Sequence, residues 1–206
     1  SLANANKVWK VINPSKYACI ARDKYLSHCL LDSLNIPKSE LYIYYNPQFA
    51  YNTDKLAFNY EGVVNIIKEK DIKQCVIKPS QDSTHGHGVI VCNNIEIADG
   101  KCLLKKFDGQ TIELNSLLGE QPLLFESFVK QSEQLASFNP SSVNTVRMMT
   151  ALYPNNEVKL IASFIKIGRA GSCVDNAGAG GNVDAAIDIN SGKLYNTLEF
   201  NSWHNI

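Results

Sequence analysis

A lysine followed by a glycine-containing loop is the segment of this chain with the clearest chemical potential. Residues 76–91 are VIKPSQDSTHGHGVIV, so an apolar run ends at Lys78, a polar loop contains Gly86, His87 and Gly88, and a second apolar run follows. Glycines let backbone N–H groups approach an anion closely, and a lysine supplies the point charge that phosphate oxygens need. The segment therefore predicts a hairpin around a phosphate, with an ordinary solvated hairpin turn as the alternative.

A second segment, LFESFVKQSE at residues 124–133, carries a carboxylate near each end. Backbone groups around Phe128 and Val129 can pair with the edge of an adenine, and Glu133 can accept hydrogen bonds from ribose hydroxyls. The alternative is that Glu126 and Glu133 are solvated surface residues. The segment predicts an adenosine site only in combination with the phosphate loop.

The elements that must position these residues are of mixed type. Apolar spacing predicts one helix over residues 23–34, ended by Asn35-Ile36-Pro37, and a second over 60–70. A short helical piece is predicted over 112–118, after turn signals at 99–100 and 108–109. Strands are predicted at 74–78, 88–93, 123–129, 145–153 and 158–167, the last two joined by a turn at 154–156. The pattern indicates an α+β fold with a hairpin-rich second half.

Composition excludes several classes of protein. The chain has 206 residues, of which 45% are hydrophobic, and its 20 basic and 20 acidic residues cancel. This balance gives no nucleic-acid footprint, and no apolar run is long enough to span a bilayer, so we expect a cytoplasmic protein. The six cysteines form no CxxC pair and are expected to be buried free thiols; they are Cys19, Cys29, Cys75, Cys92, Cys102 and Cys173.

Three further blocks carry a family resemblance: NPSSVNTVRMMT at 139–150, IKIGR at 165–169 and VDNAGAGG at 174–181. With Lys78, the glycine loop and the two glutamates, their order resembles the ATP-grasp superfamily over about residues 20–195. Within it, the chain is most similar to the sugar-transfer-associated proteins found with bacterial polysaccharide biosynthesis, which are related to α-L-glutamate ligases. The resemblance implies two α+β lobes with antiparallel sheets that clasp ATP between them. The expected division is an N-terminal segment, 1–20, a first lobe with the phosphate lid, 21–125, and a second lobe, 126–206, incomplete at its C-terminus.

The resemblance also implies roles for particular residues. Lys24, after Asp23, matches the first triphosphate-binding cation, although a surface lysine is an equally good interpretation, and Lys78 matches the second. The expected nucleotide-binding set is Lys24, Lys78, Gly86, His87, Gly88, Glu126, Phe128, Val129 and Glu133. Residues expected near the γ-phosphate are Arg147, Lys166 and Asn176, with Arg169 as a substitute because Lys166 stands where the family has arginine. His85 and His87 have no third metal ligand in sequence reach, so phosphate contact or solvent exposure is expected for them.

The implied cofactors are ATP and Mg²⁺. Glu199 and Asn201 form a Glu-x-Asn pattern of the kind that holds magnesium. We interpret it as a coincidence and expect the metal ligands beyond Ile206 in a longer protein; Glu199 and Asn201 remain the alternative. The implied activity is ligation of a carboxylate to an amine, such as an amino acid or amino sugar, through an acylphosphate in surface or capsular polysaccharide biosynthesis. A catalytically incomplete nucleotide-binding module and a phosphotransferase are the alternatives, and the expected partner is a small molecule rather than a nucleic acid.

Overall fold

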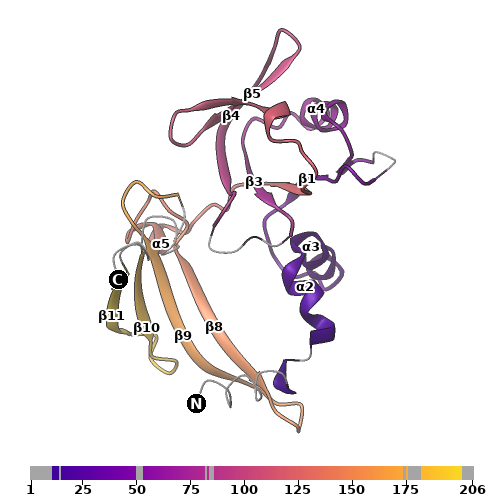
Figure 1. Cartoon of the computed structure of the whole chain (residues 1–206). Coiled ribbons are helices and arrows are strands. Elements are labelled where there is room, and N and C mark those ends of the chain that lie inside the picture. Colours follow the sequence, from indigo (N-terminus) through magenta and orange to yellow (C-terminus); the bar gives the residue numbers. More distant parts are fainter. Residues whose placement is uncertain are drawn as a thin grey trace. The chain divides into compact units, whose positions relative to one another are not determined.

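The structure, a computed structural model (Figure 1), describes residues 11–13, 15–49, 53–81, 83, 86–173, 175 and 182–200. The chain divides into two units. Unit 1 consists of Ser1–Ser83 and Gly88–Phe128, and unit 2 of Thr84–His87 and Val129–Ile206. Each unit is built around its own sheet, so the predicted α+β class is confirmed.

Unit 1 contains a seven-stranded sheet in which only the β1–β2 pair is parallel. In spatial order its strands are β2 (Leu56–Ala57), β1 (Leu41–Tyr45), β7 (Leu123–Glu126), β3 (Cys75–Pro79), β4 (Ile90–Ala98), β5 (Lys101–Lys106) and β6 (Thr111–Glu113). The phosphate-loop segment is therefore the β3–β4 hairpin, as predicted, and β7 pairs with the other edge of β3.

Helices cover both faces of this sheet. Helix α4 (Tyr60–Glu69) begins after Asn59, whose side chain accepts a hydrogen bond from the Gly62 N–H at 2.8 Å, and it buries its valines and isoleucines in the larger core. Helix α3 (Lys24–Ser33) follows the 3-10 turn η1 (Ser15–Tyr17) and helix α2 (Ala18–Arg22). It packs on the other face, where Tyr25 stacks on Tyr44 with ring centroids 3.8 Å apart.

Strand alternation places two predicted site residues on the α3 face of the sheet. Leu124 packs there with Leu41 and Tyr44. Lys78 lies opposite Leu124, and Glu126 is two residues beyond Leu124 on β7. Because opposite residues share a face and side chains alternate along a strand, Lys78 and Glu126 project toward α3, whereas Phe125 enters the α4 core.

Unit 2 contains a four-stranded antiparallel sheet in the order β11 (Leu194–Phe200), β10 (Asn182–Ile187), β9 (Val158–Gly168) and β8 (Thr145–Leu152). A short helix, α5 (Glu133–Ala136), precedes it. The predicted β8–β9 hairpin is confirmed, and its turn uses Asn156 at a φ of 62°.

Several local predictions need correction. The helical piece expected over 112–118 is the short strand β6 followed by a 3-10 turn, η2 (Leu114–Ser116), because Ile112 pairs with Leu104 of β5 and Leu114 enters the core. Strands β1, β2, β5, β10 and β11 and helices α2 and α5 were not predicted. Of the cysteines, Cys75, Cys92 and Cys102 are buried as expected, whereas Cys19 and Cys29 are exposed and Cys173 is half-buried.

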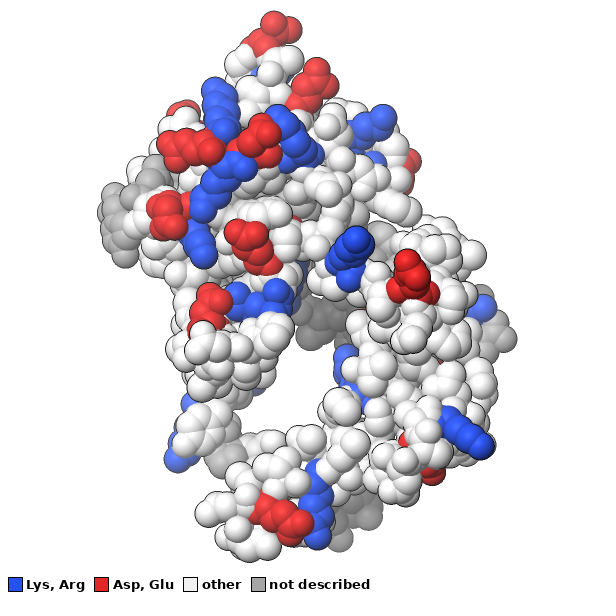
Figure 2. Space-filling model, turned by 180° about the vertical axis from the view of Figure 1, so that it is seen from behind, with Lys and Arg blue, Asp and Glu red and all other residues white. Residues whose placement is uncertain are grey.

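The surface agrees with the balanced composition. On the face in Figure 2, the described lysine and arginine side chains are interspersed with acidic ones and do not gather into one basic patch. Among the helices of the described residues, none has the length and apolar character needed to cross a membrane.

Candidate functional site

The N-terminus of α3 is joined to the end of β3 by Asp23. One carboxylate oxygen, Oδ1, accepts hydrogen bonds from the Tyr25 N–H and the Ser80 hydroxyl, both at 2.8 Å. The other, Oδ2, accepts from the Gln81 amide at 2.7 Å, and the Lys24 N–H donates to the Ser80 carbonyl at 2.8 Å. Burial raises the pKa of Asp23, but these hydrogen bonds outweigh it and hold the pKa below its usual value. The charged cap therefore anchors the helix to the start of the phosphate loop.

Lys24, the first helical residue after this cap, reaches the loop itself. Its Nζ atom donates to the Ser83 carbonyl oxygen at 3.2 Å and to the Ser83 hydroxyl at 3.0 Å. The side chain is therefore bound to the loop and does not extend freely from the helix surface. This contact favours the interpretation of Lys24 as a loop-associated cation.

The loop requires glycine at position 88 for two reasons. First, Gly88, like Gly86, lies in the left-handed region, with φ values of 74° and 78° respectively. A Cβ atom on Gly88 would also lie 2.8 Å from Cγ of Pro79 on the neighbouring strand. His87 between them is exposed, and His85 lies outside the described residues. Gly88 thus lets the hairpin close tightly against β3.

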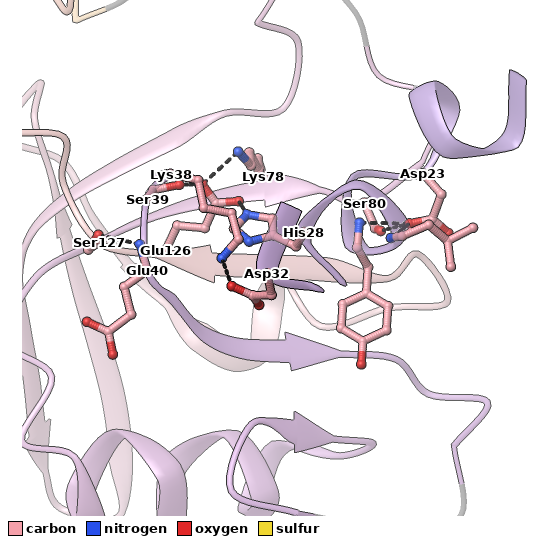
Figure 3. Close-up of polar contacts among 12 residues, drawn as sticks. Asp23, His28, Asp32, Lys38, Ser39, Glu40, Lys78, Ser80, Glu126 and Ser127 are labelled. Carbon is pink, nitrogen blue, oxygen red and sulfur yellow. Dashed lines mark hydrogen bonds and ion pairs between the residues drawn. The ribbon is translucent and has the colours of Figure 1, made fainter. Parts of the chain in front are cut away.

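Glu126 is the most enclosed charged residue of the predicted site, with 3% of its surface exposed. Figure 3 shows three side chains around its carboxylate. His28 Nε2 lies 2.7 Å from Oε1, and both Lys78 Nζ and Ser39 Oγ lie 2.7 Å from Oε2. The alternative that Glu126 is a solvated surface residue is therefore wrong.

The electrostatics of this cluster favour an ionised carboxylate. Burial raises the pKa of Glu126, but the Lys78 ammonium, with hydrogen bonds from Lys78, Ser39 and His28, lowers it further, so the pKa lies below its usual value. The Lys78 side chain remains 25% exposed, against 8% for His28. Lys78 is thus the one ionisable partner of Glu126 with substantial access to solvent.

His28 and Ser39 were not predicted as site residues. They lie 98 and 87 residues from Glu126 along the chain. They contact Glu126 because α3 and the segment after it pack over β7. A single histidine one helical turn after Lys24 forms no sequence pattern that would identify it as a partner of Glu126.

The segment after Glu126 leads from unit 1 to unit 2. The Ser127 N–H donates to the Glu40 carbonyl at 2.9 Å, and the Ser127 hydroxyl accepts from the Glu40 N–H at 2.9 Å. Phe128 is half-buried and ends unit 1, whereas Val129 is exposed and begins unit 2. Glu133 is an exposed residue in the first turn of α5, whose N-cap is Ser132.

In unit 2 the sheet register gathers the predicted phosphate-binding cations with carboxylates. Lys166 on β9 lies opposite Thr145 on β8 and Asp184 on β10. Arg147 is two residues beyond Thr145, so these side chains share one face of the sheet. The Thr145 hydroxyl donates to Asp175. The structure therefore brings Arg147 and Lys166 to the same face.

Asp184 is the titratable group that this arrangement perturbs. Burial is the largest influence and raises the pKa of Asp184, and the nearby Asp175 carboxylate also raises it. Lys166 and Arg147 lower it, but the pKa stays above its usual value. Asp184 and Asp175 together balance the two cations, a feature that sequence patterns alone did not assign.

Two buried asparagines fix the loop before β8 against the end of β9. Asn144 is 2% exposed; its amide donates to the Leu135 carbonyl at 2.8 Å, and its oxygen accepts from the Gly168 N–H at 3.2 Å. Asn139 donates to the carbonyls of Gly168 and Arg169 at 2.7 and 3.0 Å. The half-buried Arg169 therefore belongs to a segment that both asparagines hold in place.

Comparison with protein families agrees with this geometry. The model of the sugar-transfer associated ATP-grasp family matches residues 4–205. The chain belongs to this family. No curated protein and no solved structure matches it. Family membership supports ATP binding and agrees with the two-sheet α+β architecture.

Two expected site residues of this ATP-grasp chain, Asn176 and Asn201, lie outside the described part. Glu199 lies in β11, opposite Val183. Across the described ranges, no three histidine, cysteine, aspartate or glutamate side chains are grouped so that they could hold a metal ion. The assignment of magnesium ligands, including Glu199 and Asn201, stays a prediction.

Proposed function

We propose that this ATP-grasp protein transfers the γ-phosphoryl group of ATP to a substrate carboxylate, which gives an acylphosphate and ADP. An amine then attacks the acylphosphate to form an amide and releases phosphate. The proposed setting is the biosynthesis of a bacterial surface or capsular polysaccharide. The observation that carries the proposal is the partly exposed Lys78 ammonium, held 2.7 Å from the buried Glu126 carboxylate beside a glycine-containing hairpin.

Lys78 suits a triphosphate because an ammonium group offers three donors and a compact charge to phosphate oxygens. Strand β3 fixes the position of the Lys78 backbone, and the Glu126 carboxylate binds Nζ when no phosphate is present. Lys24 supplies a second ammonium, which is bound to Ser83 in the loop. Backbone groups around Phe128 and Val129 are of the kind that can pair with the adenine edge.

The chemistry of the second unit concerns the transferring phosphoryl group. Arg147 and Lys166 share one face of the β8–β9–β10 sheet, and cations of this kind stabilise negative charge in phosphoryl transfer. Asp184 and Asp175 lower the net charge of that face in the absence of an anion. We propose that Arg147 and Lys166 neutralise the phosphoryl group as it passes to the substrate carboxylate, with Arg169 and Asn176 nearby in sequence.

Magnesium would neutralise the β- and γ-phosphates in such a reaction. Among the described residues, no three histidine, cysteine, aspartate or glutamate side chains are grouped so that they could hold it. No step of the proposed mechanism is therefore assigned to a metal ligand of this chain.

Nucleotide binding is tested by the melting temperature with and without MgATP. ATP should raise it, and Lys78→Ala should remove the rise, whereas Lys105→Ala, at an exposed position on β5, should leave it intact. A wild-type protein that shows no shift would contradict the nucleotide assignment.

The reaction is tested by ADP release with candidate acceptors. Release that requires a carboxylate together with an amine supports the ligase. Release with a hydroxyl acceptor alone would replace it with a phosphotransferase, and ATP binding without any turnover would indicate a nucleotide-binding module.

A further inference from the structure

Strands β8 and β9 continue as a two-stranded ribbon beyond the rest of the unit 2 sheet. Strand β10 pairs with β9 only from Ser163 to Gly168, whereas β8 pairs with β9 as far as Val158 (Figure 1). Among the described residues, the part of β9 before Ser163 therefore has β8 as its only strand neighbour. A two-stranded ribbon is marginally stable by itself, so a further strand would stabilise this one.

One face of this ribbon carries exposed apolar side chains. Side chains alternate along a strand and opposite residues share a face, so this apolar ribbon face consists of Val146, Met148, Leu152 and, opposite Leu152 on β9, Val158. These four residues are between 45% and 71% exposed, and Arg147 lies on the other face. Neighbouring exposed apolar residues of this kind mark a surface that contacts another molecule.

The outer edge of β8 is open to strand pairing. In the part of the chain that the structure describes, β8 is the last strand of its sheet, so the N–H and C=O groups that point outward have no strand partner. The register shift opposite Met149 and Thr150 places its extra residue, Ile161, on β9, so β8 itself stays regular. Its sequence, TVRMMTAL, contains one charged residue, Arg147, and no proline. The edge thus lacks the lysines, prolines and bulges that commonly prevent the addition of a strand.

The charge pattern of the ribbon suits a second copy of the same strand. An antiparallel β8 pair around a two-fold axis places Arg147 opposite an uncharged residue in every register except the one in which the two arginines face each other. Near the tip of the ribbon, Glu157 and Lys159 pair at 3.5 Å and leave no net charge there. Two copies can therefore approach along β8 without like charges opposite one another.

We propose that this protein forms a symmetric dimer in which the β8 strands of two copies pair antiparallel and join their four-stranded sheets into one continuous sheet. In a register centred on Met149, Val146 lies opposite Leu152 of the second copy, so the apolar ribbon faces of the two copies become continuous. Arg147 and Lys166 lie on the other face of the sheet, so this apolar contact does not cover them. The dimer does not depend on ATP binding or on the proposed reaction.

Light scattering coupled to size-exclusion chromatography, over a series of protein concentrations, measures the mass of the particle. The wild type should approach twice the 22.8 kDa of one chain as the concentration rises. Met148→Lys and Leu152→Lys each place a charge on the apolar ribbon face, at an exposed position that tolerates lysine in the monomer. Each should raise the Kd of the dimer by at least about tenfold, because a charge in the contact lacks a partner.

Phe107→Lys is the matched control, since it introduces lysine at an exposed apolar residue of unit 1. It should form the dimer as the wild type does. A wild type that stays monomeric at every concentration would overturn the proposal. A dimer that both lysine variants retain at the wild-type Kd would overturn it equally.

Hydrogen exchange locates the contact in the wild type. The outward-pointing amides of β8 should exchange more slowly at concentrations that favour the dimer than in the dilute monomer. A dimer whose protection is confined to segments other than β8 would refute the proposal. Thermal unfolding checks that both lysine variants are folded, and if they are not, the exchange of the wild-type β8 amides decides between these outcomes.

Discussion

Replacing Lys78 with methionine leaves the Glu126 carboxylate buried with only His28 and Ser39 as partners. Removing one member of a buried ion pair typically costs about 3–5 kcal/mol, because the remaining charge lacks compensation. The Lys78 side chain is 25% exposed, so water already screens part of the pair, and two hydrogen bonds remain. We therefore expect Lys78→Met to lower the free energy of unfolding of unit 1 by about 2–3 kcal/mol.

A double-mutant cycle separates this charge effect from lost packing. Glu126→Gln removes the buried charge and leaves the partly exposed Lys78 ammonium, which should cost about 1 kcal/mol. The double variant contains neither charge, so its loss should be smaller than the sum of the two single losses by about 1.5 kcal/mol. Lys105→Met on β5 is the matched control and should change stability by less than about 0.5 kcal/mol.

Hydrogen exchange at the amides of β3 and β7 under native conditions reports on unit 1 without requiring that both units unfold together. Losses that add within about 0.5 kcal/mol in the cycle would refute the reasoning, because independent sites behave in that way. So would a Lys78→Met protein as stable as the Lys105→Met control.

Three further predictions concern other parts of the chain. In urea denaturation, Gly88→Ala should destabilise unit 1 by at least about 1 kcal/mol more than Gly109→Ala. Both glycines have positive φ, but only a Cβ atom at position 88 would lie against the Pro79 ring of β3. Equal losses of stability would contradict this close approach. Folding lowers the pKa of Glu126, so the stabilisation that its charge contributes is complete above the ordinary glutamate pKa of about 4.3 and is lost as the pH falls through the lower pKa of the folded protein. Glu126→Gln should therefore make the free energy of unfolding less dependent on pH on the acid side. An unchanged pH dependence would argue against an ionised carboxylate. Asn144→Ala should cost unit 2 about 2–3 kcal/mol by hydrogen exchange, because it leaves buried backbone groups unpaired, whereas the exposed Asn155→Ala should cost less than about 0.5 kcal/mol.

The hairpin that contains the loop could be predicted from the order of residues. Lys78, the two glycines and the flanking β-branched runs indicate a hairpin with an anion-binding loop, and β3 and β4 form that hairpin. Helices α3 and α4 could likewise be predicted, because both combine an amphipathic pattern with a side-chain cap. These features depend on neighbouring residues, so the sequence contains them directly.

The strands β10 and β11 show where such reasoning stops. Residues 182–187 are NVDAAI, a segment with little β-branched character, and they become a strand because β9 and β11 pair with both of its edges. Tertiary pairing outweighs the weak local preference there. Similarly, β6 is extended because it pairs with β5.

The amino-acid sequence alone was sufficient to indicate the family, because motif order encodes it, and local spacing made Lys78, Glu126 and the glycine-containing loop candidates for the site. It left open whether Glu126 is a solvated residue or a buried one. Only the packing of α3 over β7 decided this, since it brings His28 within 2.7 Å of a carboxylate 98 residues away. Burial makes this glutamate an anion that needs charged or hydrogen-bonding partners, and Lys78, Ser39 and His28 supply them.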